Sequence, residues 1–201
     1  MLTCRLLTLA VLGLVIAMAP MEPGVAAPRK PTPKKVPPAL NFTMNDIDGK
    51  PVRLSNFEGD VIMIVNVASF CGNTPQYASL QKLYDRYKSK RFTVLAFPAN
   101  EFGRQEPGTD KEIKAFCETG YHVTFPVFSK IVVKGDGQHP LYQYLTSKST
   151  NPKFGGEIEW NFAKFLLNRK GEVVARFPAG EDPLKQDVVE TIERELEKPK
   201  K

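Results

Sequence analysis

The stretch that decides the fold is Val61-Ile-Met-Ile-Val-Asn-Val-Ala-Ser-Phe-Cys71-Gly-Asn-Thr-Pro75. Its first seven residues are mostly apolar and β-branched, which predicts a strand buried on both faces. The pair Gly72-Asn73 indicates a turn. Thr74 is a candidate N-cap, and Pro75 suits the first position of a helix. Cys71 is therefore expected where a buried strand ends and a helix begins.

A cysteine at the start of a helix lies near unpaired backbone N–H groups and the positive end of the helix dipole. Both favour the thiolate form, so Cys71 is a candidate reactive thiol. The alternative is a buried structural cysteine, which is common in protein cores. The helix that follows is expected to bury one face, made of Tyr77, Leu80, Leu83, Tyr84 and Tyr87.

The chain has 201 residues, which suits one domain with appendages. Its formal net charge is +6, but residues 1–38 carry +4 and residues 198–201 carry +3, so the rest carries −1. The basic residues are thus in the tails, and we expect no nucleic-acid partner.

Residues 1–27 resemble a signal peptide, because Arg5 precedes an apolar stretch over residues 6–19 and small residues follow at 24–27. We expect an exported protein, periplasmic or secreted, with an uncleaved membrane anchor as the alternative. Residues 28–39 form a Pro/Lys-rich linker, and the domain spans residues 40–198. Cleavage would remove Cys4 and leave Cys71 and Cys117, a pair that is either a permanent disulfide or a catalytic one.

Apolar runs and turn signals predict the order of elements. We expect an N-terminal hairpin, helices that alternate with buried strands, a second hairpin and a final amphipathic helix. The hairpins fall at 42–54 and 162–177, the strands at 61–67, 92–97 and 125–131, and the helices after Pro75, at 109–120, at 139–147 and from Asp182. This order predicts an α/β fold with a mixed central sheet that has helices on both faces.

A cysteine after the first parallel strand is the arrangement of thioredoxin-like folds. The chain lacks the Cys-x-x-Cys of thioredoxins, since Thr74 takes the second cysteine position, and it lacks the Pro and Thr that precede the nucleophile in peroxiredoxins. Over about residues 40–195 it resembles the glutathione peroxidase family in its cysteine form. The stretches that carry this resemblance are Asn66-Val-Ala-Ser-Phe-Cys71-Gly-Asn-Thr74, Leu95-Ala-Phe-Pro-Ala-Asn-Glu-Phe-Gly-Arg-Gln-Glu-Pro-Gly108 and Trp160-Asn-Phe-Ala-Lys-Phe-Leu166.

The resemblance implies that Cys71 is the peroxidatic cysteine, and that Trp160 and Asn161 supply neutral donors beside its sulfur. The chain departs from the family pattern at Ala99, which replaces a cysteine, and at Glu101, which replaces a glutamine that we take as the catalytic amide. An ionised Glu101 would repel a thiolate. It could also be protonated, point to solvent, or accept the thiol proton. We therefore include Glu101 among the site residues.

Cys117 matches the resolving cysteine of the two-cysteine, thioredoxin-dependent branch. The resemblance implies that a Cys71 sulfenic acid forms a disulfide with Cys117, and that a thioredoxin-like protein, rather than glutathione, reduces this disulfide. A short connection between Leu145 and Ile158 implies a monomer. We expect no cofactor and no metal, because the two histidines stand apart in the sequence.

Two other functions remain compatible with the sequence. The same Cys71–Cys117 pair could act as a redox relay or sensor that oxidises a partner protein. Alternatively, the fold could be non-catalytic and hold Cys71–Cys117 as a structural disulfide. Catalytic consumption of hydroperoxide with a reducing system separates the peroxidase from both.

Overall fold

The computed structural model describes residues 36–199, so the predicted signal peptide (1–27) and most of the predicted linker lie outside the described residues. The described end of that linker is part of the domain. Residues Pro38–Leu40 form a 3-10 helix, η1, in which Ala39 and Leu40 are buried. The domain therefore begins slightly before the predicted residue 40.

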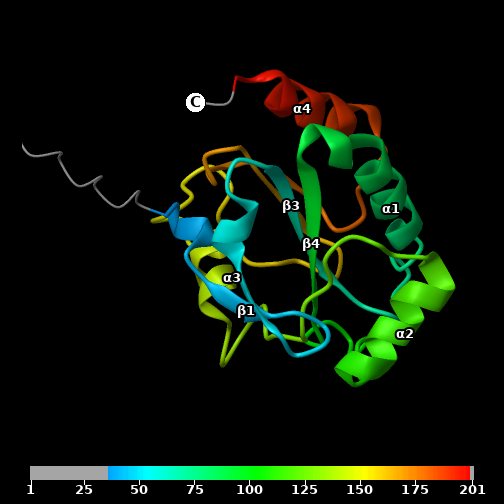
Figure 1. Ribbon diagram of the computed structural model, residues 1–201. Helices are drawn as coiled ribbons and strands as arrows, with labels where there is room; N and C mark the ends of the chain where they lie inside the picture. The colour runs from blue at the N-terminus through cyan, green and yellow to red at the C-terminus, as the bar shows by residue number, and fades with distance from the viewer. Residues whose placement is uncertain (1–35, 200–201) are drawn as a thin grey trace, which may run out of the picture. The chain divides into compact units, whose positions relative to one another are not determined.

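A four-stranded sheet in the order β4-β3-β5-β6 forms the centre of the domain (Figure 1). Strands β3 (Val61–Val67) and β4 (Phe92–Pro98) are parallel and buried throughout. Strands β5 (Lys164–Leu167) and β6 (Val173–Phe177) form an antiparallel hairpin, and β5 also pairs antiparallel with β3. This mixed sheet confirms the predicted α/β fold.

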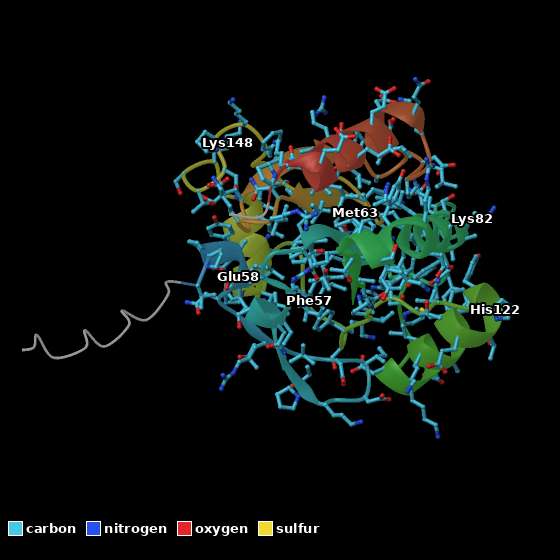
Figure 2. The ribbon with its side chains drawn as sticks, turned by 45° about the horizontal axis from the view of Figure 1, so that its top comes forward. Phe57, Glu58, Met63, Lys82, His122 and Lys148 are labelled. Atoms are coloured by element: carbon cyan, nitrogen blue, oxygen red, sulfur yellow. The ribbon has the colours of Figure 1, made fainter. Side chains whose placement is uncertain are left out.

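Helices cover both faces of the sheet. The core on one face contains buried residues of α1 (Gln76–Tyr87), α2 (Asp110–Tyr121) and α4 (Gln186–Glu197). The core on the other face contains buried residues of α3 (Pro140–Thr146) and of the N-terminal segment. Met63, on β3, lies among the side chains that fill the interior (Figure 2).

The N-terminal hairpin is confirmed, with β1 (Thr43–Asn45) antiparallel to β2 (Pro51–Arg53). Two further 3-10 helices, η2 (Leu54–Phe57) and η3 (Lys88–Lys90), lead into β3 and β4. The predicted strand over residues 125–131 is wrong. Only two isolated bridges form there, at Val127 and Phe128. Pro126 has no N–H to donate, which prevents a continuous ladder.

Two predicted helix starts are corrected. Helix α1 begins at Gln76 and has no side-chain cap, because the Thr74 hydroxyl is used in the preceding turn. Helix α4 begins at Gln186, since the Asp182 carboxylate accepts from the Leu184 N–H and forms a separate turn first. Within residues 36–199, none of the helices combines the length and apolar character that a membrane span requires.

Candidate active site

Cys71 lies in the turn between β3 and α1, as the sequence predicts. Thr74 fixes this turn, because its hydroxyl accepts from the Cys71 N–H at 2.9 Å and donates to the Ala68 carbonyl at 2.9 Å. The Thr74 N–H in turn donates to the Cys71 carbonyl at 2.9 Å. The backbone of Cys71 is therefore held from both sides. The residue is buried, although its exposed fraction of 8% is larger than the 1% of Cys117.

Asn73 connects the Cys71 sulfur to the Trp-Asn segment. The Asn73 backbone N–H donates to Cys71 Sγ at 3.4 Å, and its Nδ2 donates to the Asn161 carbonyl at 3.2 Å. Residues 90 positions apart in the sequence thus share one hydrogen-bonded unit. A backbone N–H directed at the sulfur is the kind of group that stabilises a thiolate at the start of a helix.

Gln105 supplies the side-chain amide of the site. Its Oε1 accepts from Asn161 Nδ2 at 3.0 Å, and its backbone carbonyl accepts from the Phe70 N–H at 3.0 Å. Asn161 is fully buried, and its Oδ1 has no hydrogen-bond partner among the described residues. Gln105 thereby joins the Cys71 turn to Asn161, a role that the sequence analysis missed.

Glu101 makes no hydrogen bond to Cys71, Asn161 or Gln105, and its exposure agrees with the alternative in which its side chain points to solvent. Its carboxylate Oε2 accepts from the Val133 N–H at 2.8 Å, and the residue is exposed. The reason lies in the chain between positions 101 and 105. Gly103 and Arg104 have φ values of 65° and 55°, so a left-handed turn sends the two side chains to different surroundings. Positive φ at two successive residues is hard to foresee from sequence.

Trp160 lies at the edge of the site. Its backbone carbonyl accepts from Asn66 Nδ2 at 3.1 Å, and its ring is 5.8 Å from that of Phe102. The Asn66 carbonyl accepts from the Phe162 N–H, and Phe162 has a φ of 72° that turns the chain into β5. Trp160 is 40% exposed, although it is a large aromatic residue.

Phe70 gives the site an apolar rim. It precedes Cys71, is 66% exposed and contacts Phe116 of α2 at a centroid distance of 6.2 Å. A solvent-exposed phenylalanine that precedes the thiol in the chain and packs on a second aromatic ring is apolar surface of the kind that contacts apolar ligands.

Cys117 has very different surroundings, inside helix α2. It is 1% exposed, and both cysteines are free thiols in this structure. The pKa of the Cys117 thiol is raised to about 11, mainly by burial and in part by the charges of Glu106 and Glu118. Tyr77 of α1 lies against the thiol and lowers its pKa by hydrogen bonding. The predicted capping box starts α2, since Thr109 and Glu112 each accept from the other's backbone N–H.

Glu106 is a buried acid between the two cysteine segments. It is fully buried, and the cavity of about 380 Å³ that it lines also includes Ser69, Phe70 and Phe116. Burial raises the pKa of the Glu106 carboxyl to about 7, and contacts with Ser69 and the charge of Lys130 oppose this rise. Nothing in the sequence shows that the Glu106 side chain is buried in the folded protein.

The two histidines lie apart. His122 ends α2 at the surface (Figure 2), and His139 caps α3, with Nδ1 accepting from the Leu141 N–H at 3.2 Å. No group of three or more His, Cys, Asp or Glu side chains within residues 36–199 is arranged to hold a metal ion.

Comparison with known proteins identifies the relatives of this chain. Residues 39–146 match the family model of glutathione peroxidase. Hydroperoxy fatty acid reductase gpx1 of Synechocystis sp. is 55% identical over 141 residues, which cover 68% of this chain and 83% of that protein. Thioredoxin/glutathione peroxidase BtuE of Escherichia coli is 43% identical over 178 residues, with coverages of 79% and 97%.

The solved structures agree on the fold. The crystal structure of T. cruzi GPX1 superposes with a TM-score of 0.59 at 38% sequence identity, covering 79% of this chain and 93% of that one. With the mixed sheet and its two helical layers, this similarity confirms the predicted thioredoxin-like fold.

Proposed function

This chain belongs to the glutathione peroxidase family, and we propose that it is a thiol peroxidase that reduces hydrogen peroxide or organic hydroperoxides with Cys71. The observation that carries this proposal is the unit in which Asn73 links Cys71 Sγ to Asn161, and Asn161 binds Gln105. Trp160 and these amides are neutral donors, which can hold a hydroperoxide and stabilise the departing oxygen without opposing a thiolate.

The first step oxidises Cys71. Its thiolate attacks one oxygen of the hydroperoxide, the O–O bond breaks, and the other oxygen leaves as an alcohol, or as water for hydrogen peroxide, after it takes a proton. Cys71 becomes a sulfenic acid. The exposed Phe70 and Trp160 support organic hydroperoxides as substrates, as does the relative whose name is hydroperoxy fatty acid reductase.

Cys117 resolves the sulfenic acid in our proposal. Its thiolate attacks the Cys71 sulfur, a disulfide forms, and the hydroxyl leaves as water after protonation. Because Cys117 is buried within α2, this helix must loosen before the two sulfurs can meet. A thioredoxin-like protein then reduces the disulfide by thiol–disulfide exchange, with glutathione as the less effective donor. The relative named thioredoxin/glutathione peroxidase supports thioredoxin as a donor.

The experiment is hydroperoxide consumption by the purified chain with either thioredoxin and its reductase or glutathione and its reductase, followed through NADPH. We expect sustained turnover with thioredoxin and slower turnover with glutathione. A single turnover followed by arrest with both donors would contradict the peroxidase assignment and would favour a redox relay that oxidises a partner protein.

We propose further that the protein is exported and acts as a monomer. Residues 1–27 have the charge and hydropathy pattern of a signal peptide, and the connection between Leu145 and Ile158 is short. The N-terminal mass of the protein recovered from fractionated cells tests export, and light scattering tests the oligomeric state. A chain that starts at Met1 in the soluble cytosolic fraction would contradict export, whereas one that starts at Met1 in the membrane fraction would indicate an anchor.

A further inference from the structure

Lys164 is a buried cation that the proposed reaction does not use. It is fully buried at the first position of β5, and no other lysine or arginine within residues 36–199 is buried. It follows Trp160 by four positions and pairs with Val65 of β3 and Phe177 of β6. Removing an ammonium group from water is costly, so a cation here requires specific partners.

The partners of the Lys164 ammonium are backbone carbonyls of a single loop. Its Nζ donates to the carbonyls of Pro178 and Ala179, each at 3.3 Å, and to that of Glu181 at 2.6 Å. Among residues 36–199, no carboxylate accepts a hydrogen bond from this ammonium. Three carbonyls that converge on one cation fix the path of the loop over residues 178–181.

The backbone of Ala179 connects this loop to two segments of the active site. Its carbonyl also accepts from Nε2 of Gln76, the first residue of α1, at 2.8 Å. Its N–H donates to Oε1 of Glu159, the residue before Trp160, at 2.9 Å. The backbone N–H and carbonyl of this one residue thus hold β5, the start of α1 and the Trp160 segment together.

We propose that Lys164 is a positioning residue, which holds the backbone of Ala179 in place and so fixes the Trp160 segment and the start of α1, the helix that follows Cys71. This role rests on the function proposed above, because it assumes that Trp160 and Cys71 act together. It is a role for a residue that contacts neither the thiol nor the hydroperoxide.

The charged groups around Lys164 affect the pH at which its ammonium group loses its proton. The carboxylates that act on it are those of Glu181 and Asp182 in the loop and of Glu159. Glu181 pairs with Lys185, and Glu159 pairs with Arg176, so both carboxylates are already shared with other cations. The neighbours from α1, β3 and β6 are the neutral Gln76, Val65 and Phe177.

Burial lowers the pKa of Lys164 to about 8, although these carboxylates raise it in part. Loss of the proton in mildly alkaline solution removes the charge that gathers the three carbonyls. We therefore expect the surroundings of Trp160 to change near pH 8.

The test uses the fluorescence of Trp160, the only tryptophan in the chain. It is carried out on the full chain with Cys71→Ser, so that ionisation of this thiol does not contribute. We expect the emission to change between pH 7 and pH 9.5, with a midpoint near 8. The additional change Lys164→Met should abolish this transition and shift the emission already at pH 7. Lys88→Met, a control at an exposed lysine, should leave the titration unchanged.

A second measurement follows the reaction itself. In the chain with Cys71 intact, Lys164→Met should slow alkylation of Cys71 and its oxidation by hydroperoxide about ten-fold, since a small misplacement by a remote change can cost up to about 100-fold. Alkylation needs no hydroperoxide, so it tests the positioning role even if the chain proves not to be a peroxidase.

Gln76→Leu covers the case in which Lys164→Met does not fold. This change removes only the hydrogen bond from Gln76 to Ala179, at a partly exposed position, and we expect a shift in Trp160 emission and a smaller loss of rate. The proposal is overturned if the folded Lys164→Met variant keeps wild-type emission, titration and alkylation. If that variant does not fold, unchanged emission and rates in Gln76→Leu overturn it.

Discussion

The two cysteines of the domain occupy opposite kinds of environment. Cys71 lies in the turn between β3 and α1, with its backbone held by Thr74 and a backbone N–H directed at its sulfur. Cys117 lies within a helix, buried among aromatic rings, and burial raises its pKa to about 11. The first environment directs a donor at the sulfur, whereas the second encloses the thiol in a helix and disfavours its ionisation. In this account, the order of the two chemical steps follows from this difference.

The largest expected effect is the difference in alkylation between the two thiols. At pH 7.5 a thiol with a pKa of about 11 is ionised in only about one molecule in 3,000. Iodoacetamide should therefore modify Cys71 at least about 100-fold faster than Cys117 in the reduced protein. Peptide mass spectrometry measures both rates. The Cys71→Ser variant is the control, because it gives the alkylation rate of Cys117 alone. Equal alkylation rates of the two thiols in the folded protein would contradict the proposed difference in their reactivity.

Substitutions of Gln105 and Glu101 test which of these two side chains affects the rate of Cys71 oxidation. Gln105→Ala removes the acceptor of Asn161 Nδ2 and should slow oxidation of Cys71 by up to about 100-fold, the cost of a small misplacement of a group in the site. Glu101→Gln is the matched control, since its carboxylate binds the Val133 N–H instead, and it should change the rate less than two-fold. Stopped-flow oxidation compares the two, and the reverse result would restore Glu101 to the site.

Glu106 is related to the surroundings of both cysteines. It lines a cavity together with Phe70 and Phe116, and its charge raises the pKa of Cys117. The pKa of Glu106 in the folded protein, about 7, exceeds the ordinary value of 4.5, so the folded state binds more protons between these pH values. The free energy of unfolding should therefore fall as pH rises from about 4.5 to about 7, by about 3 kcal/mol from this group.

Glu106→Gln should flatten that part of the stability profile, as urea unfolding at several pH values will show. The exposed carboxylate of Glu118, on α2, provides the control, since Glu118→Gln should leave the slope unchanged. A slope that persists in Glu106→Gln would mean that another group causes it.

The smallest expected effect concerns the loosening of α2. Gly120 lies in the last turn of this helix, and a Cβ at this position would meet no atom within 4 Å. Gly120→Ala should stabilise the helix by up to about 1 kcal/mol. If α2 must unwind for Cys117 to reach Cys71, disulfide formation should slow by up to about five-fold, while oxidation of Cys71 keeps its rate. Stopped-flow measurement resolves the two steps, and equal disulfide rates would argue that the helix does not open.

Much of the fold could be predicted because its pattern is local. The mostly apolar, β-branched residues of β3 predict a buried strand and the capping box predicts the start of α2, and both predictions are confirmed. The apolar pattern around Val127 and Phe128 predicts a strand, but only isolated bridges form there. A pattern of apolar residues does not show that the Pro126 backbone has no N–H to donate.

The site depends on contacts between distant segments, which the sequence does not reveal. Gln105 and Glu101 lie four positions apart, and only the left-handed turn at Gly103 and Arg104 decides which one reaches Asn161. In the same way, nothing in the sequence marks Lys164 as the residue that gathers the carbonyls of a loop 14 or more positions away. Such roles become visible when the contacts are known.

The proposal that hydroperoxide oxidises Cys71, and that Cys117 then resolves the sulfenic acid, is tested by reaction of the reduced protein with one equivalent of hydroperoxide. No reductant is present, and the products are identified by peptide mass spectrometry. We expect a Cys71–Cys117 disulfide in the wild-type chain and a trapped sulfenic acid on Cys71 in Cys117→Ser. We expect Cys71→Ser to leave the hydroperoxide unconsumed. Oxidation that appears first on Cys117, or hydroperoxide consumption that persists in Cys71→Ser, would contradict the proposal.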